Sequence, residues 1–278
     1  MTINSVQIIL GFVLALIISL IAWRAHMLSQ GGAVAATLLG MVVFGFGGLG
    51  WAVLLIAFFV SSSLLSRFSG DSKSSLNDKF SKGSRRDAGQ VLANGFIPGV
   101  FSFLNLIYPS NPILWMGFAG SLAAVNADTW ATELGVLGRQ APRLITSWKR
   151  VETGESGGVT GLGTLAALGG SLFIAVASVL IGKIIFVGDI SFNPILILIC
   201  ITLAGFCGSI IDSVLGAAVQ ASYFCPVCNK RTEHFPRHTC GNPTSLISGQ
   251  SWLNNDGVNL ICASAGASLS IFSWIFLI

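Results

Sequence analysis

Long apolar segments separated by short polar connections run along the whole chain of 278 residues. Most of these segments approach or exceed the roughly 20 residues that an α-helix needs to cross the hydrocarbon core of a bilayer. The shortest connection is the glycine-rich turn Phe46–Gly50, between the second segment and the third. The pattern predicts an all-α fold, a polytopic transmembrane helical bundle forming a single membrane domain over residues 1–278. About eight spans are expected from length and apolarity, at 4–23, 31–47, 49–67, 89–108, 112–137, 158–187, 193–222 and 256–276.

Composition argues against a soluble protein. Hydrophobic residues make up 53% of the chain and charged residues only 9%, whereas soluble domains carry about 25% charged residues. No polar block is large enough for a separate soluble domain. The expected surroundings are a lipid bilayer and small ligands, and no nucleic acid; the sequence leaves a homodimer open.

The basic residues are distributed very unevenly between the two sides of the predicted bundle. All but one of the 15 Lys and Arg residues fall in alternate connections, and only Lys183 lies towards the other side. Connections rich in Lys and Arg stay in the cytoplasm, so both termini are expected on the opposite side. The basic residues on the cytoplasmic side are Arg24, Arg67, Lys73, Lys79, Lys82, Arg85, Arg86, Arg139, Arg143, Lys149, Arg150, Lys230, Arg231 and Arg237.

A polar insertion at 223–255, in the last of these connections, has the spacing of a metal site. Cys225 and Cys228 form a Cys-x-x-Cys pair, and His234, His238 and Cys240 follow. Two Cys followed by His and Cys are typical of a structural zinc site with four ligands. We predict a zinc knuckle made by the three cysteines and His238, with His234 as the alternative histidine. A disulfide and unliganded thiols are the competing interpretations, but a disulfide fits poorly with a reducing cytoplasmic face.

Two aspartates, Asp128 and Asp212, lie inside predicted spans, where ionised side chains are costly and usually functional. Asp128 shares a helical stripe with small and hydroxyl residues, and Asp212 lies on a stripe of glycines and serine. The pair predicts a divalent cation, Mg²⁺ shared with a phosphate, with a buried polar tie between helices as the alternative. Glu133 is either a further ligand or a carboxylate that snorkels at the helix end, and it shares with Asn126 a second stripe of the same helix, next to the one that carries Asp128.

Groups suited to anions lie on the same predicted face. A basic segment leads into the fourth span, and a turn rich in glycine and hydroxyl residues opens the sixth. Such helix N-termini offer backbone N–H groups to phosphate. Positive-inside topology and contact with lipid headgroups explain much of the basic charge, but not the amides and glycines beside it. The candidates are Lys82, Arg85, Arg86, Gln90, Asn94, Lys149, Arg150, Ser156, Gly157, Gly158, Asn255 and Asp256.

Six motifs occur together over almost the whole chain. They are NADTWATELG at 126–135, PRLIT at 142–146, SGGVTGLGT at 156–164, GSIIDSVLGA at 208–217, CPVC at 225–228 and WLNNDGVN at 252–259. In combination they resemble the integral-membrane family that includes phytyl-phosphate kinase of tocopherol synthesis. The spacing of Asp128, Ala131, Gly135 and Gly138 is also similar to that in membrane CTP-dependent polyprenol kinases and cytidylyltransferases.

The resemblance implies a kinase that transfers a phosphoryl group from CTP, or another nucleoside triphosphate, to an isoprenoid monophosphate such as phytyl phosphate. Phosphoryl transfer requires positioning and charge neutralisation more than a covalent catalyst. Asp128 and Asp212 would hold Mg²⁺, with Glu133 as a further ligand, direct or through water. Lys82, Arg86 and the other basic candidates would neutralise phosphates, and the amides and glycines would orient them.

Other classes of protein stay open at this point. A CTP-dependent cytidylyltransferase acting on a lipid phosphate would release pyrophosphate, whereas the kinase releases CDP. A transporter of anions or lipid phosphates could also use intramembrane acids and broken helices. Against transport, the polar residues gather on one side and leave the other nearly bare. A purely structural membrane protein fits the intramembrane acids least well.

Overall fold

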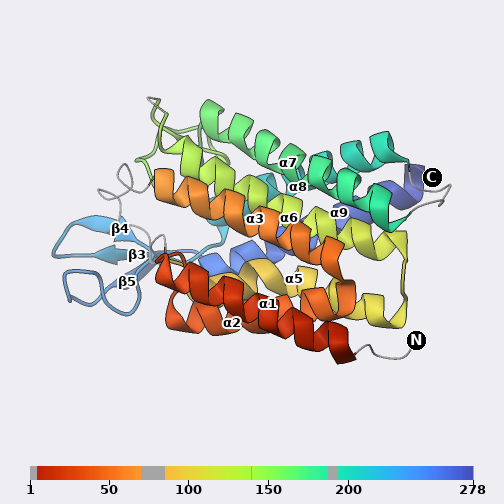
Figure 1. Ribbon diagram of the computed structural model, residues 1–278. Coiled ribbons are helices and arrows are strands. Elements are labelled where there is room, and N and C mark those ends of the chain that lie inside the picture. The colour runs from red at the N-terminus through yellow and green to blue at the C-terminus, as the bar shows by residue number, and fades with distance from the viewer. Residues whose placement is uncertain (1–4, 70–84, 139, 187–192, 278) are drawn as a thin grey trace.

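The computed structural model describes residues 5–69, 85–138, 140–186 and 193–277, and in these ranges the long helices form one bundle (Figure 1). The helices are α1 Ser5–Arg24, α2 Gln30–Val42 with its π-helical extension η1 Val43–Gly47, α3 Leu49–Phe68, α5 Ala88–Ile107, α6 Pro112–Gly135, α7 Gly161–Ile185, α8 Pro194–Ala218 and α9 Asn255–Leu277. Seven of the described helices, with η1 counted as part of α2, are long and apolar enough to cross a membrane. The predicted helical membrane bundle is confirmed. Seven of the eight predicted spans coincide with these helices, and the eighth, at 112–137, coincides with α6, which is not among the seven.

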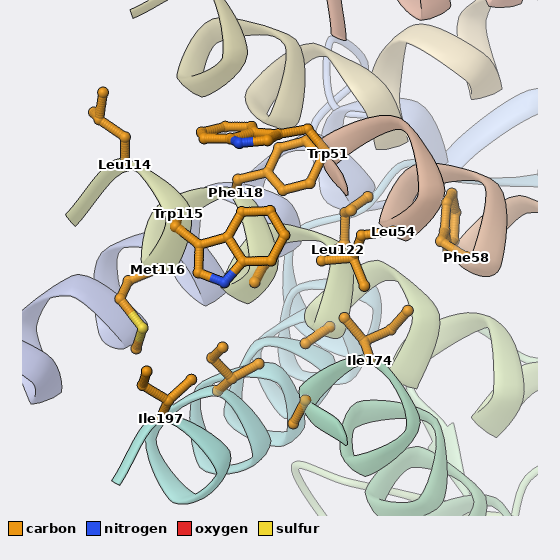
Figure 2. Packing of buried hydrophobic residues seen from close by; sticks show 14 of the residues in the cluster. Trp51, Leu54, Phe58, Leu114, Trp115, Met116, Phe118, Leu122, Ile174 and Ile197 are labelled. Atoms are coloured by element: carbon orange, nitrogen blue, oxygen red, sulfur yellow. The ribbon is translucent and has the colours of Figure 1, made fainter. Parts of the chain in front are cut away.

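Helix α6 lies at the centre of the bundle, where it contacts α3, α5, α7, α8 and α9. Every residue from Leu114 to Ala127 is buried. Trp115 and Phe118 pack against Trp51 of α3, with ring centroids 5.4 Å and 4.6 Å from the Trp51 ring (Figure 2). Because other helices surround α6, it can carry polar residues inside the bundle. These residues make α6 too polar to be one of the seven apolar helices.

Small residues let α8 and α9 approach α6 closely. A Cβ atom at Gly208 of α8 would lie 2.6 Å from the Cβ of Ala124. A Cβ atom at Gly266 of α9 would lie 2.5 Å from the carbonyl oxygen of Gly120. Both distances are shorter than a van der Waals contact, so these helices can pack at this separation only with glycine in place. The close packing draws α8, which carries Asp212, against the helix that carries Asp128.

The two ends of the bundle differ in chemistry. Helix α1 begins and α9 ends at one end, and strands β3, β4 and β5 lie at the other, which we call the sheet end (Figure 1). The sheet end carries basic residues that were predicted to be cytoplasmic. Examples are Arg24, the last residue of α1, and Arg67, in the last turn of α3. Lys183 lies in the last turn of α7, at the opposite end. The predicted positions Lys73, Lys79, Lys82 and Arg139 lie outside the described residues.

Two small sheets occupy connections at the sheet end. Strand β1 Arg143–Leu144 pairs with β2 Gly158–Val159, and β3 Ser222–Cys225 lies between β4 Lys230–Thr232 and β5 Ser245–Ser248, all antiparallel. These strands correct two predicted span boundaries: α7 begins at 161 and not at 158, and α8 ends at 218 and not at 222. Thr160 sets the start of α7, because its side chain accepts a hydrogen bond from Gly163 N.

Candidate functional site

A pocket of about 340 Å³ lies at the sheet end between α6, α7 and α8, and we call it the acidic pocket. One wall is the stripe of α6 that runs from Asp128 to Gly135. The facing wall belongs to α8 and carries Ser209, Asp212 and Gly216. The connection between α6 and α7 forms the rim. The two stripes singled out in the sequence therefore face the same cavity.

The carboxyl groups of Asp128 and Asp212 meet inside the acidic pocket. They lie close enough to interact electrostatically, and Oδ2 of Asp212 is buried with no hydrogen-bond partner among the described residues. Two carboxylates in such contact repel each other when both are ionised. A shared proton or a divalent cation removes that repulsion, and hard oxygen atoms are the ligands that Mg²⁺ prefers. The donor set thus fits Mg²⁺ with a phosphate.

A tight glycine turn forms the rim next to these carboxylates. Gly157 has a φ of +76°, and a Cβ atom there would lie 2.5 Å from the backbone N of Ala217. The N–H of Gly158 donates a hydrogen bond to Glu155 O at 3.0 Å. Ser156 and both of these glycines line the acidic pocket, and their role in binding phosphate stays a prediction. The positive φ and the contact with α8 both require glycine at 157.

The pocket contains a carboxylate that the sequence analysis missed, Glu233, which directly follows β4. Its Oε1 accepts a hydrogen bond of 2.8 Å from Ser156 Oγ and one of 2.8 Å from Gln220 Nε2. Glu233 lines the acidic pocket and interacts electrostatically with Asp212. The only sign in the sequence that Glu233 could belong to a functional site was its acidic side chain within the polar insertion. Helical periodicity could not relate it to α6, because the folded insertion determines its position.

Glu133 and Arg86 lie away from the acidic pocket, since neither is among its lining residues. The Glu133 carboxylate faces α3, where it accepts hydrogen bonds from Ser66 Oγ, at 2.8 Å, and from Ser69 Oγ. Arg86 lies near Glu133; burial lowers the pKa of its guanidinium to about 10, and the Glu133 charge opposes that shift. The arrangement corresponds to a polar tie between helices, so we leave both residues out of the proposed site.

Asn126 is also a tie between helices. Its side chain is fully buried. Its Nδ2 donates to Gly170 O of α7 at 2.8 Å, and its Oδ1 accepts from Ser61 Oγ of α3 at 3.1 Å. These contacts use both ends of the amide, which holds three helices together and does not line the pocket.

Of the other four candidates near the rim, one lines the acidic pocket and three do not. Asn255, at the start of α9, lines the acidic pocket, whereas Asp256 does not. Lys149 and Arg150 are exposed on the α6–α7 connection, and Trp148 beside them lines the pocket. These two cations can approach a bound phosphate only from the open side of the rim.

The candidates that precede and begin α5 lie in another part of the molecule. Gln90 and Asn94 line a second cavity together with Arg86. The guanidinium Nε of Arg85 donates to Leu28 O at 2.9 Å. None of these residues lines the acidic pocket, and Lys82 lies outside the described residues.

The polar insertion brings four candidate metal ligands together. The ligand atoms of Cys225, Cys228, His238 and Cys240 all lie within 4.8 Å of one another. The sulfur atoms of Cys225 and Cys240 are 3.6 Å apart, close to the roughly 3.8 Å that tetrahedral geometry with bonds of about 2.3 Å implies. The structure includes His238 in this cluster and not His234, whose ring centroid is 5.9 Å from that of His238.

Hydrogen bonds polarise two thiols of this cluster in opposite directions. Contacts from Asn242, and after them one from His238, lower the pKa of Cys240 to about 6. A hydrogen bond with Cys240, reinforced by burial, raises the pKa of Cys228 to about 11. Zinc binds the thiolate form of cysteine, and the lowered pKa of Cys240 suits that role.

Comparison with known proteins places the chain in a family. Residues 13–267 match the family described as "Integral membrane protein DUF92". The chain belongs to the DUF92 family. Among its relatives, "Protein PGR" of Arabidopsis thaliana is 35% identical over 267 residues, which cover 88% of this chain and 90% of that protein. No solved structure matches the chain closely enough to count as similar.

Two further relatives extend the comparison. "Uncharacterized membrane protein MJ0933" of Methanocaldococcus jannaschii is 29% identical over 266 residues, covering 96% of this chain and 94% of that protein. "Protein VTE6, chloroplastic" of Arabidopsis thaliana is 25% identical over 255 residues, covering 90% of this chain and 66% of that protein. The DUF92 match includes both aspartates of the acidic pocket and all four residues of the Cys–His cluster.

Proposed function

We propose that this DUF92 protein is a membrane phosphotransferase. It transfers the γ-phosphoryl group of CTP, or of another nucleoside triphosphate, to an isoprenoid monophosphate and forms the diphosphate. The observation that carries the proposal is the convergence of Asp128 and Asp212 in one pocket of a membrane bundle. The six motifs that resemble the integral-membrane family including phytyl-phosphate kinase support it.

In this proposal Asp128 and Asp212 hold Mg²⁺, which neutralises phosphate charge when bound. An oxygen of the acceptor phosphate forms a bond to the γ-phosphorus while the bond to the β-phosphate oxygen breaks, and CDP leaves. The acceptor oxygen is already anionic near neutral pH, so no strong general base is required. The turn at Ser156–Gly158 and the hydroxyl groups of Thr132 and Ser213, which line the same pocket, orient the phosphates.

The position of the pocket suits an acceptor with a long apolar tail. Phe206 and Ile210 of α8 line the acidic pocket, and Ile210 is 38% exposed on the surface of the bundle. An isoprenoid chain can therefore leave the pocket sideways, between lipid-facing side chains. In this proposal the sheet end lies in the cytoplasm, where its basic residues belong by the positive-inside rule and where nucleoside triphosphates are available.

The second part of the proposal is a structural Zn²⁺ held by Cys225, Cys228, His238 and Cys240. Four protein ligands leave no open coordination position, so the metal would stabilise the insertion and take no part in catalysis. Glu233 directly follows strand β4 of the insertion and accepts hydrogen bonds from Ser156 and Gln220 inside the acidic pocket. A metal that stabilises the insertion would therefore also keep Glu233 in the pocket.

The proposal is tested with purified protein in lipid nanodiscs, Mg²⁺, each nucleoside triphosphate, and phytyl or geranylgeranyl phosphate. Both nucleotide and lipid products are resolved. We expect CDP and the isoprenoid diphosphate. Pyrophosphate with a CDP-lipid would instead identify a cytidylyltransferase. Failure of every nucleotide and acceptor pair to react, in protein that retains its fold, would refute both activities.

A further inference from the structure

A second cavity, of about 310 Å³, lies between the α1–α2 hairpin, α3 and the first half of α5, and we call it the lateral cavity. It has no lining residue in common with the acidic pocket. Helices α1 and α3 both contribute lining residues to this cavity, so side chains leave part of the space at these helices unfilled.

The lateral cavity is apolar over most of its length and polar at one end. Its α3 wall runs from Leu49 to Phe59, which corresponds to about 15 Å at a rise of 1.5 Å per residue. Three polar side chains, Arg86, Gln90 and Asn94, line the cavity where α5 begins, at the sheet end. A molecule that matches this lining has an apolar chain and a polar head.

The polar end carries a buried positive charge. Arg86 is only 9% exposed, and its guanidinium carbon lies 5.6 Å and 5.7 Å from the ring centroids of Phe58 and Phe59, which also line the cavity. The Glu133 carboxylate, whose charge acts on Arg86, accepts hydrogen bonds from Ser66 of α3 and from Ser69, which caps that helix. Oδ1 of Asn94 is buried with no hydrogen-bond partner among the described residues. A buried guanidinium is stable only where anionic or strongly accepting groups surround it.

We propose that the lateral cavity binds one acyl chain of an anionic phospholipid, with the phosphate at Arg86. The bilayer can supply such a chain directly, because Leu14 and Ile18 on the α1 wall are 44% and 36% exposed on the surface of the bundle. Arg24 and Arg85 are exposed at the same end of the bundle and add positive charge at headgroup level. Basic pockets between helices are a recognised binding site for anionic headgroups. This site does not depend on the proposed phosphotransferase activity.

Native mass spectrometry of the whole protein tests the proposal, after reloading with dioleoyl phosphatidylglycerol or dioleoyl phosphatidylcholine. We expect one phosphatidylglycerol to be retained per chain, and phosphatidylcholine to be lost. Ala36→Phe fills the lateral cavity and should abolish retention. Val34→Phe is its matched control, because Val34 is on the same helix, 62% exposed and not part of the lining.

The charge is tested separately with Arg86→Gln, using Arg67→Gln as the control at an exposed position of α3. Arg86→Gln should weaken retention by at least roughly fivefold, the factor that about 1 kcal/mol per basic residue implies. Equal retention of both lipids, or undiminished retention by Ala36→Phe, would overturn the proposal. A further sample is reloaded with geranylgeranyl phosphate, and the proposal would also be overturned if Ala36→Phe lost that lipid and still retained phosphatidylglycerol. No outcome depends on turnover, so a failed transfer assay leaves the site standing.

Discussion

At the scale of single residues, carboxylates within this bundle serve two different purposes. The Glu133 carboxylate accepts hydrogen bonds from Ser66 and Ser69 of a neighbouring helix. The carboxylates of Asp128 and Asp212 face a cavity, and part of the Asp212 carboxylate has no partner among the described residues. A carboxylate whose acceptor positions are used by the protein stabilises the fold, whereas one that faces a cavity is available to a ligand.

Replacing either aspartate should therefore abolish transfer without unfolding the protein. Asp212→Asn removes an anionic metal ligand, and we expect turnover to fall by about a hundredfold or more. The same change removes repulsion between two carboxylates, so thermal stability without Mg²⁺ should stay level or rise. Turnover at limiting Mg²⁺ and thermal unfolding are measured on the same preparation. Near-normal transfer by both Asp128→Asn and Asp212→Asn would mean that the pair only ties two helices together.

Glu133→Gln provides the matched comparison on the same helix, with the opposite outcome. The substitution weakens two buried hydrogen bonds to serine hydroxyls and removes the charge nearest to Arg86. We expect a loss of about 1–3 kcal/mol in the free energy of unfolding, with turnover per folded molecule largely retained. A large loss of turnover at unchanged stability would instead indicate that Glu133 is a ligand of the metal.

Gly157 offers a second test at this scale, because both its backbone and its surroundings require glycine. Gly157→Ala places a Cβ atom against the backbone of Ala217 and forces a positive φ on alanine, at a cost of about 1–3 kcal/mol. Turnover should fall together with stability, because the substitution displaces the turn that forms the rim of the acidic pocket. Gly161→Ala is the control, because nothing lies within 4 Å of a Cβ atom there. Equal behaviour of the two variants in turnover and thermal unfolding would show that the turn tolerates a side chain.

At the scale of elements, hydrophobic patterning located the helices well, because each segment is long and its polar flanks are distinct. It was less informative about α6, whose polar residues reflect protein neighbours on every side. The stripe on α6 and the stripe on α8 line one cavity, and the magnesium site expected there stays a prediction. The spacing could not show that Glu133 faces away from that cavity or that Glu233 enters it. Both depend on which helix or insertion packs nearby, which a single sequence does not encode locally.

The polar insertion leads to a prediction that joins two elements. Metal analysis should find about one zinc per chain, as for one site with four ligands. Cys228→Ser should remove it and also lower turnover, because the insertion holds Glu233 against Ser156 and Gln220 in the acidic pocket. Arg231→Gln, which breaks only a largely exposed ion pair with Glu155, should change either property little. Zinc-free protein with unchanged stability and turnover would refute a structural metal.

At the scale of the whole molecule, the bundle separates an apolar body from one chemically active end. The acidic pocket, the Cys–His cluster and the polar end of the lateral cavity all lie at the sheet end. A transport pathway needs polar groups through the full thickness of the membrane. This arrangement favours chemistry on a lipid whose head reaches one surface while its tail stays in the bilayer.

The same asymmetry predicts that the sheet end faces the cytoplasm. Thr146, exposed on the α6–α7 connection, and Ser110, exposed between α5 and α6, mark opposite ends of the bundle. With a membrane-impermeant maleimide, Ser110→Cys should be labelled on intact cells, and Thr146→Cys only after permeabilisation. The parent protein, labelled in parallel, accounts for its own cysteines. Ready labelling of Thr146→Cys from outside would invert the topology, place the Cys–His cluster in a compartment that permits disulfides, and remove the cytoplasmic supply of nucleotide on which the proposed transfer depends.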